Sequence, residues 1–329
     1  KMDLLFKKPH EETKRIMSRV AIGKTPLDEK DMSFTEIAQY NLEETINHKY
    51  AHILNSGNGA IFTALASVTG KIILPNQGGW NGFKQISRFL DKPFEMVETD
   101  LGLIDLENLN DILSSLDKSV KNGFVLTSFA GYTAEQNIRE ISKICHDNDV
   151  ILIEDVSGSI ADSKSRLANG KYSDIIVGST GSPKILNVRD GGFITSDDPS
   201  IFEDNRILLK SFKSNEITAS GIVSELSFAE DNLNKTIDAC MYIKSNLDNV
   251  IYPDKRGINV IVKSDNPKEL SWNLKKEFNL DEHGMITRCP NYNRVKEKAV
   301  AIEIKNLDIS ELEKDNLDRI IEVIKKHQN

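Results

Sequence analysis

Short apolar runs alternate with longer segments of helical periodicity over the first two thirds of the chain. The apolar runs are compact and rich in β-branched residues, as expected of strands buried on both faces. They lie at 71–77, 93–100, 123–129, 150–158, 173–180 and 191–198. The segments between them repeat apolar residues every three to four positions, which is typical of amphipathic helices. They lie at 32–48, 81–91, 105–116 and 134–149. This alternation predicts an α/β fold with a mostly parallel sheet and helices on both faces.

The pattern changes after about residue 200. A long charged amphipathic helix is expected over 227–247, then strands near 258–264 and 300–306, and a closing helix over 311–327. We therefore predict three parts. Residues 1–30 form an N-terminal segment that packs on the small domain or on a partner, residues 31–205 form the large α/β domain, and residues 206–329 form a small C-terminal α+β domain.

Composition narrows the functional class. The 329 residues are 39% hydrophobic and 28% charged, as in an ordinary globular protein, and the net charge of −8 argues against nucleic acid as a partner. Three widely spaced cysteines predict neither a disulfide framework nor a zinc site, and they favour a reducing cytoplasm. No apolar run reaches membrane-spanning length, and the histidines show no metal-ligand spacing. We therefore expect a cytoplasmic protein without a metal site or a membrane contact.

Two ionisable residues follow neighbouring predicted strands. Asp155 directly follows the run VILIE, and Lys184 follows the next strand within the sequence GSTGSPKILNVRDGG. In open α/β sheets, ligands bind beyond the carboxyl ends of the strands. Pyridoxal phosphate chemistry requires a lysine that can form a Schiff base with the cofactor. It also requires a carboxylate that can pair with the protonated pyridine nitrogen.

A glycine-rich turn supplies the third component of such a site. The sequence NSGNGAIFTAL at 55–65 reads as the end of a strand, a turn and the start of a helix. The first N–H groups of a helix bind phosphate well, and glycine lets the backbone approach the ligand closely. Together with Asp155 and Lys184, this turn predicts a pyridoxal phosphate site.

These motifs resemble those of fold-type I pyridoxal phosphate enzymes, and most closely the DegT/DnrJ/EryC1/StrS sugar aminotransferases. The resemblance covers roughly residues 33–240 and includes the phosphate turn, the segment from 125 to 158, and the loop with a serine five positions before the lysine. It implies that Lys184 is the Schiff-base lysine and that Asp155 is the pyridine partner. It also implies cofactor contacts from the side chains of Ser179 and Ser128 and from the backbone around Gly57 and Asn58. Trp80 is the candidate for an aromatic side chain that stacks on the cofactor ring. Enzymes of this type build each active site from two subunits, so a homodimer is implied.

The sequence departs from the family pattern at four positions. Gly158 stands where the family usually has Gln or His near the cofactor, and Ser128 stands where a His is common. Ser220 and Ile222 replace an Asn and an Arg in the segment that reaches the partner subunit's phosphate. These differences leave the cofactor expected and put the usual substrate in question.

Three functions are compatible with these observations. The first is transfer of an amino group from an amino acid, for which the resembled family usually takes glutamate, to a keto acceptor such as a sugar. The second keeps the cofactor but performs β-elimination or replacement, with Cys289 as a candidate sulfur carrier and Arg288 as a candidate carboxylate ligand. The third is a non-catalytic protein with the same fold.

Overall fold

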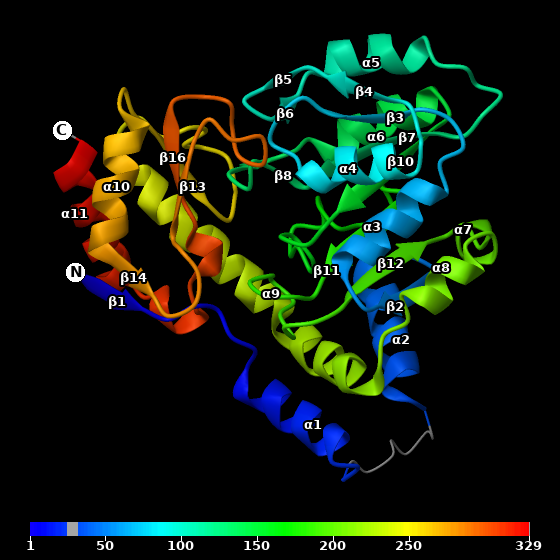
Figure 1. Cartoon of the computed structure of the whole chain (residues 1–329), viewed down its shortest axis with the longest axis horizontal. Helices are drawn as coiled ribbons and strands as arrows, with labels where there is room; N and C mark the ends of the chain where they lie inside the picture. Colours follow the sequence, from blue (N-terminus) through cyan, green and yellow to red (C-terminus); the bar gives the residue numbers. More distant parts are fainter. Residues whose placement is uncertain (25–31, 329) are drawn as a thin grey trace.

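A seven-stranded sheet forms the centre of the molecule in the computed structural model, which describes residues 1–24 and 32–328 (Figure 1). Its strands lie in the order β2-β12-β11-β10-β7-β3-β4. All neighbouring pairs are parallel except those made by β12, which runs antiparallel to β11 and to β2. The strands are β2 (Tyr50–Leu54), β3 (Ile72–Pro75), β4 (Phe94–Val97), β7 (Asn122–Thr127), β10 (Val150–Asp155), β11 (Ile175–Ser179) and β12 (Gly192–Ser196). The predicted α/β class with a mostly parallel sheet is confirmed.

Alternate side chains of these strands enter two different cores. On one face, Leu152 and Phe124 pack with α2 (Phe34–Ile46), α5 (Leu106–Ser114) and α6 (Ile138–Asp147). On the other face, Ile153 and Val125 pack with α3 (Gly57–Ala66), α4 (Asn81–Phe89) and α7 (Ser200–Glu203). Helices therefore cover both faces of the sheet. Because successive side chains in a strand point to opposite sides, neighbours such as Glu154 and Asp155 face different cores.

Local signals explain where several elements begin. Ser33 caps α2 in a capping box, accepting the Glu36 N–H at 3.2 Å while the Glu36 carboxylate accepts the Ser33 N–H at 2.8 Å. The helix expected over 134–149 begins only at Ile138, because Ala134–Glu135 forms the short strand β9, which pairs with β8 (Phe129–Ala130). A second short antiparallel pair joins β5 (Thr99–Asp100) to β6 (Leu103–Ile104).

The long helix α9 (Glu216–Ser245) connects the large sheet with a smaller, three-stranded antiparallel sheet (Figure 1). That sheet has the order β13-β16-β15 and packs with α10 (Pro267–Glu277) and α11 (Lys314–Gln328). Its strands are β13 (Val260–Lys263), β15 (Ile286–Arg288) and β16 (Ala299–Ile302). The remaining elements of this part are the 3-10 helices η1 (Ile304–Asn306) and η2 (Ile309–Glu311), and β14 (Phe278–Leu280). The short helix α8 (Arg206–Ser211) lies instead beside the large sheet, near α3 and α7 (Figure 1).

The N-terminal segment lies against the C-terminal part of the chain. Its first strand β1 (Met2–Leu4) pairs in parallel with β14, so both termini lie at the same end of the molecule (Figure 1). The next helix, α1 (Glu11–Ala21), packs along α9 at Gly221, where a Cβ atom would lie 2.7 Å from the Met17 sulfur. The division of the chain into domains at residues 30 and 205 stays a prediction.

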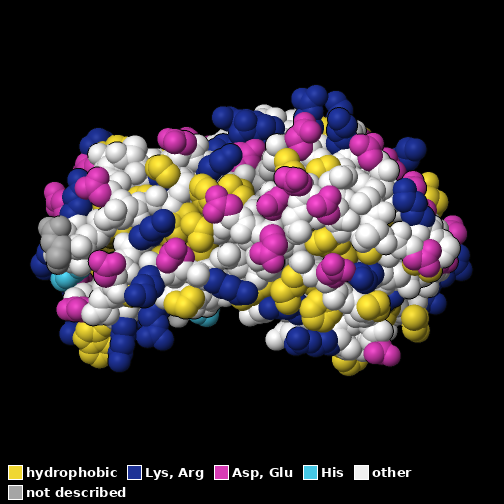
Figure 2. Space-filling model, turned by 90° about the horizontal axis from the view of Figure 1, so that it is seen from above, with side chains coloured by type: hydrophobic (Ala, Val, Ile, Leu, Met, Phe, Trp, Pro, Cys, Tyr) yellow, Lys and Arg dark blue, Asp and Glu magenta, His cyan; other side chains and the backbone are white. Residues whose placement is uncertain are grey.

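The surface carries both signs of charge. On the face shown in Figure 2, acidic and basic side chains are interspersed, with apolar side chains between them. None of the helices in the described part of the chain combines the length and the apolar character that crossing a membrane requires.

Candidate active site

Asp155 ends β10 and is 7% exposed. Its Oδ1 atom accepts hydrogen bonds from the Ser157 N–H at 3.0 Å and the Ser157 hydroxyl at 2.6 Å. Burial raises the pKa of Asp155, while the bonds from Ser157 and the nearby charge of Lys184 oppose that rise. The structure therefore holds this carboxylate in one orientation at the edge of the sheet.

Lys184 lies in the loop that connects β11 with β12. The loop is closed by backbone bonds from Lys184 to Gly181 at 3.0 Å and from Val188 to Thr180 at 2.8 Å. Burial lowers the pKa of the Lys184 ammonium, and the charge of Asp155 partly offsets this effect. A lowered pKa increases the fraction of neutral amine, which is the nucleophilic form.

Gly57 and Ser179 meet at the start of α3. A Cβ atom at Gly57 would lie 2.5 Å from the Ser179 Cβ, and one at Gly192 would lie 2.5 Å from the Gly57 nitrogen. Both positions therefore require glycine. Ser56 caps α3 by accepting the Gly59 N–H at 3.0 Å, while the first N–H groups of a helix have no partner within it.

This arrangement fits the phosphate of pyridoxal phosphate. The donors are the backbone at Gly57 and the exposed Asn58, together with the Ser179 hydroxyl, which accepts the Gly181 N–H at 3.2 Å. We call this group of Gly57, Asn58 and Ser179 the phosphate cradle. Ser157 links the cradle to the Asp155 carboxylate, since its hydroxyl also accepts the Ser179 N–H at 2.9 Å. Sequence reasoning missed Ser157, although its position two residues after Asp155 was a usable signal.

A second charged group, also missed from the sequence, lies beside Lys184. Arg294, Glu303 and Lys305 come from the C-terminal part. The charges of Arg294 and Glu303 act on the pKa of Lys184, and the charge of Lys184 acts on the pKa of Lys305. The Glu303 carboxylate is 2.8 Å from Arg294 Nε and 3.5 Å from Lys305 Nζ. Burial lowers the pKa of Lys305 to about 7, against the opposing charge of Glu303.

Tyr132 is the aromatic side chain of this charged group. The Arg294 guanidinium lies 4.7 Å from the centre of its ring, and the Lys305 ammonium lies 5.6 Å away. Burial raises the pKa of Tyr132 to about 12, with the charge of Asp155 acting in the same direction. The side chains of Tyr132, Arg294 and Lys305 therefore form one wall near Asp155 and Lys184.

The comparisons agree with this geometry. A sequence model of the DegT/DnrJ/EryC1/StrS aminotransferase family matches residues 35–231, which is more than half of the chain. The chain belongs to this family. It is accordingly a pyridoxal phosphate-dependent transferase of fold type I. The model of the MJ1341 family C-terminal domain matches residues 230–325, and a search of curated proteins finds no significant match.

Solved structures share the fold at low identity. Helicobacter pylori PseC, an aminotransferase involved in the biosynthesis of pseudoaminic acid, is 14% identical with a TM-score of 0.78, over 99% of each chain. GDP-4-keto-6-deoxymannose-3-dehydratase (ColD) is 15% identical with a TM-score of 0.71, over 98% of this chain and 100% of its own. Sphingomonas wittichii serine palmitoyltransferase is 12% identical with a TM-score of 0.74, over 99% of this chain and 86% of its own. At these identities the likeness shows the fold alone.

The structure shows the contacts of two further residues that the sequence predicts at the site. Ser128 donates to the buried Glu154 carboxylate at 2.7 Å, and Glu154 lies on the other face of the sheet from Asp155. Trp80 is the N-cap residue of α4, where its ring covers Gly82 and lies 5.7 Å from the Phe83 ring. Cofactor contacts from Ser128 and Trp80 stay predictions.

Arg288 is also separate from the charged group. It is exposed at the end of β15, where it borders a surface hollow together with Trp272 of α10. Arg294, six residues later, is the arginine that the structure places beside Lys184. Cys289 is 1% exposed, and burial raises the pKa of its thiol to about 11, so little reactive thiolate forms near neutral pH.

The positions that depart from the family pattern have local explanations. Gly158 lies against Ile258, whose Cδ1 atom would be 2.6 Å from a Cβ at that position, so the space of the usual Gln or His is filled by an isoleucine from the C-terminal part. Ser220 is fully buried within α9 and donates to the Ile217 carbonyl at 2.7 Å. Ile222 is buried in the main core.

Proposed function

We propose that this family member is an aminotransferase that moves an amino group from an amino acid, glutamate in the first instance, to a keto acceptor such as a sugar. The observation that carries the proposal is the convergence of Lys184, Asp155 and the Gly57–Ser179 cradle at one edge of the sheet. Pyridoxal phosphate bound there would supply an electron sink for negative charge at the donor α-carbon.

The roles of the protein side chains follow from their positions. Lys184 would take the proton from the donor α-carbon and deliver it to the C4′ atom of the cofactor, because its lowered pKa leaves part of the amine neutral. Asp155 would hold the positive charge of the pyridine ring in place. The Ser179 hydroxyl and the N–H groups of Gly57 and Asn58 would bind the phosphate.

Arg294 would bind the donor carboxylate. Arg294 carries a full positive charge, Lys305, with a pKa of about 7, carries a partial one at neutral pH, and Glu303 supplies one negative charge between them. The excess positive charge is buried beside Lys184, so a carboxylate placed there would complete the neutralisation. We expect Arg294→Gln to raise the KM for the donor about a hundredfold, since a charge-assisted bond contributes about 1.5–3 kcal/mol.

The test is a half-reaction monitored by visible absorbance. The purified protein should retain a coloured, borohydride-trappable cofactor, and glutamate should convert it to the amino form. Lys184→Ala should remove the trappable cofactor, whereas Lys210→Ala, an exposed lysine on α8, should not. A protein without bound cofactor would contradict the proposed role of Lys184.

Other amino acids distinguish this reaction from elimination. Release of pyruvate from cysteine or phosphoserine, without conversion by glutamate, would replace transamination with β-elimination. The burial of Cys289 counts against its use as a sulfur carrier in that reaction.

A homodimer in the cytoplasm completes the proposal. The rings of Phe89 and Phe212 each lie within 6 Å of Phe62, at 5.6 Å and 5.7 Å, and Phe89 is 78% exposed. Such an apolar surface is suited to a subunit contact. Sedimentation at decreasing concentration tests this, and a monomer with undiminished cofactor affinity would count against it. The three buried, free cysteines are compatible with a reducing compartment.

A further inference from the structure

The side chain of Tyr132 combines a constrained position with an unused hydrogen-bonding group. The partly buried residue lies in the turn between β8 and β9, and its φ of 64° falls in the left-handed region. A non-glycine residue in this region is uncommon, and such residues occur often at functional sites. The hydroxyls of Tyr242, Tyr252 and Tyr292 each donate to an oxygen. Within residues 1–24 and 32–328, the Tyr132 hydroxyl has no such partner, so it is available to a ligand.

The backbone around Tyr132 is held by a segment of the C-terminal part. The Tyr132 carbonyl accepts the N–H groups of Ile258 at 2.8 Å and Asn259 at 2.9 Å. The next residue, Thr133, donates its hydroxyl to the Asn259 carbonyl at 3.0 Å, and its own carbonyl accepts a hydrogen bond from the Lys244 ammonium at 2.6 Å. These four hydrogen bonds fix the turn, so the fold itself sets the direction of the Tyr132 side chain.

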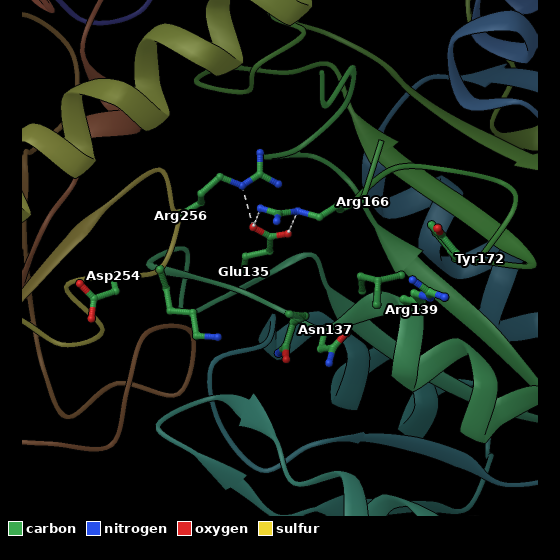
Figure 3. A pocket seen from close by; sticks show the side chains of 10 residues that line it. Glu135, Asn137, Arg139, Arg166, Tyr172, Asp254 and Arg256 are labelled. Carbon is green, nitrogen blue, oxygen red and sulfur yellow. Dashed lines mark hydrogen bonds and ion pairs between the residues drawn. The ribbon is translucent and has the colours of Figure 1, made fainter. Parts of the chain in front are cut away.

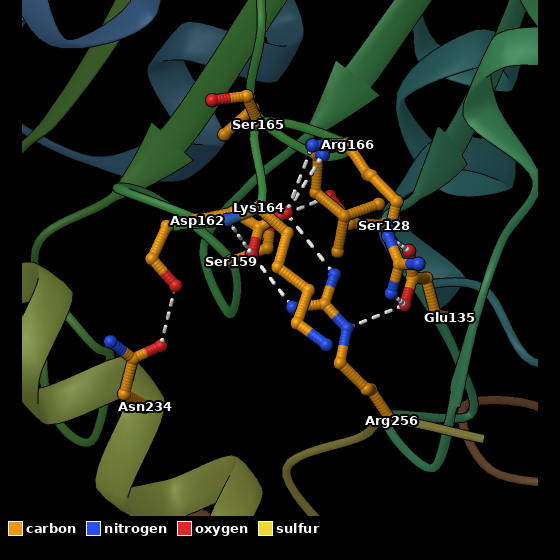
Figure 4. Close-up of polar contacts among 12 residues, drawn as sticks. Ser128, Glu135, Ser159, Asp162, Lys164, Ser165, Arg166, Asn234 and Arg256 are labelled. Atoms are coloured by element: carbon orange, nitrogen blue, oxygen red, sulfur yellow. Dashed lines mark hydrogen bonds and ion pairs between the residues drawn. The ribbon is translucent and has the colours of Figure 1, made fainter. Parts of the chain in front are cut away.

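The same segment is anchored by Arg256. Figure 3 shows the Glu135 carboxylate between Arg166 and Arg256. Arg256 donates from Nε to Glu135 at 2.6 Å and from both terminal nitrogens to Asp162, at 2.7 Å and 3.1 Å (Figure 4). The Arg256 carbonyl in turn accepts the Glu135 N–H at 2.8 Å. The side chain of Arg256 is 10% exposed and that of Asp162 is fully buried, so residues 256–259 form a rigid support for the neighbouring turn.

This segment also occupies the space beside Gly158. The Ile258 Cδ1 atom would lie 2.6 Å from a Cβ atom at Gly158. Members of the family usually carry Gln or His there, close to the cofactor, so this chain replaces a hydrogen-bonding side chain with an apolar one. Ile258 therefore fills the space at Gly158 and also holds the backbone of Tyr132. A polar group, the Tyr132 hydroxyl, thus accompanies the loss of the one at position 158.

Tyr132 lies on the side of the cofactor site that faces away from the phosphate cradle. Along the edge of the sheet, Ser179 ends β11, Asp155 ends the next strand, β10, and Tyr132 lies beyond the end of β7, the strand after that. The charge of Asp155 acts on the pKa of Tyr132, so the two side chains are near each other. On the pyridine ring, the phosphate arm and the 3-oxygen lie on opposite sides of the line from the nitrogen to the carbon that Lys184 attacks. With the phosphate in the cradle and the nitrogen at Asp155, the 3-oxygen would point toward β7 and Tyr132.

We propose that the Tyr132 hydroxyl donates a hydrogen bond to the 3-oxygen of bound pyridoxal phosphate and thereby takes the place of the polar side chain that the family has at position 158. This role of Tyr132 rests on those given to Lys184 and Asp155 under the proposed function. Burial raises the pKa of Tyr132 to about 12, so the phenol keeps its proton near neutral pH and is a donor. A donor at the 3-oxygen draws negative charge away from the Lys184 nitrogen, and the proton on that nitrogen is then lost at a lower pH.

The visible absorbance of the holoenzyme, followed over a range of pH, reports that proton directly. We expect Tyr132→Phe to raise the midpoint of the absorbance change by about one pH unit or more, because a hydrogen bond to a charged oxygen contributes a shift of about that size. Phenylalanine keeps the ring beside Arg294 and removes a hydroxyl without a partner in the described residues, so the urea midpoint of the apoprotein should not change. Tyr40→Phe, at an exposed position of α2, is the control and should leave the absorbance midpoint as in the wild type. Excess cofactor in the buffer keeps the site occupied in each variant.

An unchanged or lower absorbance midpoint in Tyr132→Phe would overturn the proposal. If the midpoint is unchanged while the KM for glutamate rises, the hydroxyl binds the amino donor instead, which also overturns it. The titration needs bound cofactor but no turnover. Failure of glutamate to convert the cofactor would therefore refute the proposed transamination and leave the role of Tyr132 standing, whereas a wild-type protein without the visible band would refute both.

Discussion

The carboxylate of Glu303 is the buried anion between Arg294 and Lys305. It is 2% exposed and also accepts a hydrogen bond from Asn259 at 2.6 Å. Burial by itself would raise the pKa of Glu303, but the charges of Lys305 and Arg294 outweigh burial and lower that pKa to about 2. Replacement by glutamine keeps the size, removes the negative charge and leaves one accepting oxygen for the two donors Arg294 and Asn259.

The expected cost of Glu303→Gln follows from this pKa. A fall from 4.5 to about 2 corresponds to about 3 kcal/mol, at about 1.4 kcal/mol for each unit of pKa. Because the folded-state pKa of this acid is below its unfolded value, the contribution is fully present above pH 4.5 and is lost as the pH falls toward 2. We therefore expect the variant to lose about 3 kcal/mol of unfolding free energy at pH 7, and much less near pH 2.

Urea unfolding of the apoprotein at a series of pH values measures this difference. Working without the cofactor keeps its binding energy out of the comparison. Glu322→Gln, an exposed residue of α11, is the matched control and should change the unfolding free energy by less than about 0.5 kcal/mol. A loss below about 1 kcal/mol for Glu303→Gln at pH 7, or a loss of the same size at pH 7 and pH 3, would refute the reasoning.

Two further substitutions test other parts of the structure. Lys7 is 2% exposed, and its ammonium has no hydrogen-bond partner in the described part of the chain, so burial lowers its pKa from 10.5 to about 8. Below pH 8 the buried charge lowers the unfolding free energy, and this loss disappears as the pH rises from 8 to 10.5. Lys7→Met should therefore increase the unfolding free energy, measured by chemical unfolding, by up to about 3 kcal/mol at pH 7 and by little above pH 10.5. A loss of stability at pH 7 would contradict this. Gly57→Val should reduce retention of the cofactor after dialysis by at least about tenfold, because even a Cβ at that position would lie 2.5 Å from the Ser179 Cβ. Ser67→Ala, at the other end of α3, is the control, and equal retention by Gly57→Val would show that the cradle does not hold the phosphate.

The elements that carry the cofactor chemistry were predictable because their signals are local. Buried strands produce continuous apolar runs, and the polar residue that ends such a run lies at the ligand-binding edge of the sheet. Asp155 is the last residue of β10, Lys184 lies in the loop that follows β11, and the turn at Gly57 follows β2. The order of these segments therefore predicted that they would converge. The orientation of Ser128 followed from the same alternation, since it is an even number of residues from Phe124 and shares the face of that side chain.

The residues expected to select the substrate were not predictable in this way. The charged wall lies more than a hundred positions after Lys184 in the sequence and consists of Arg294, Glu303 and Lys305. No local pattern distinguishes these three residues from other charged residues of the chain. They reach the site because the loop that carries Arg294 packs directly on Gly131, where a Cβ atom would lie 2.5 Å from the Arg294 carbonyl oxygen. The same packing separates Arg288, which stays exposed, from Arg294.

Periodicity and the residues at strand ends were enough to predict the α/β class and the cofactor correctly and to propose Lys184 as its lysine, because buried strands and helix starts constrain the nearby sequence. The identity of the charged wall beside Lys184, the isoleucine that fills the space at Gly158, and the support that holds Tyr132 depend on how distant segments pack together. Such contacts arise from the shape complementarity of the folded chain, and no single segment of the sequence contains them.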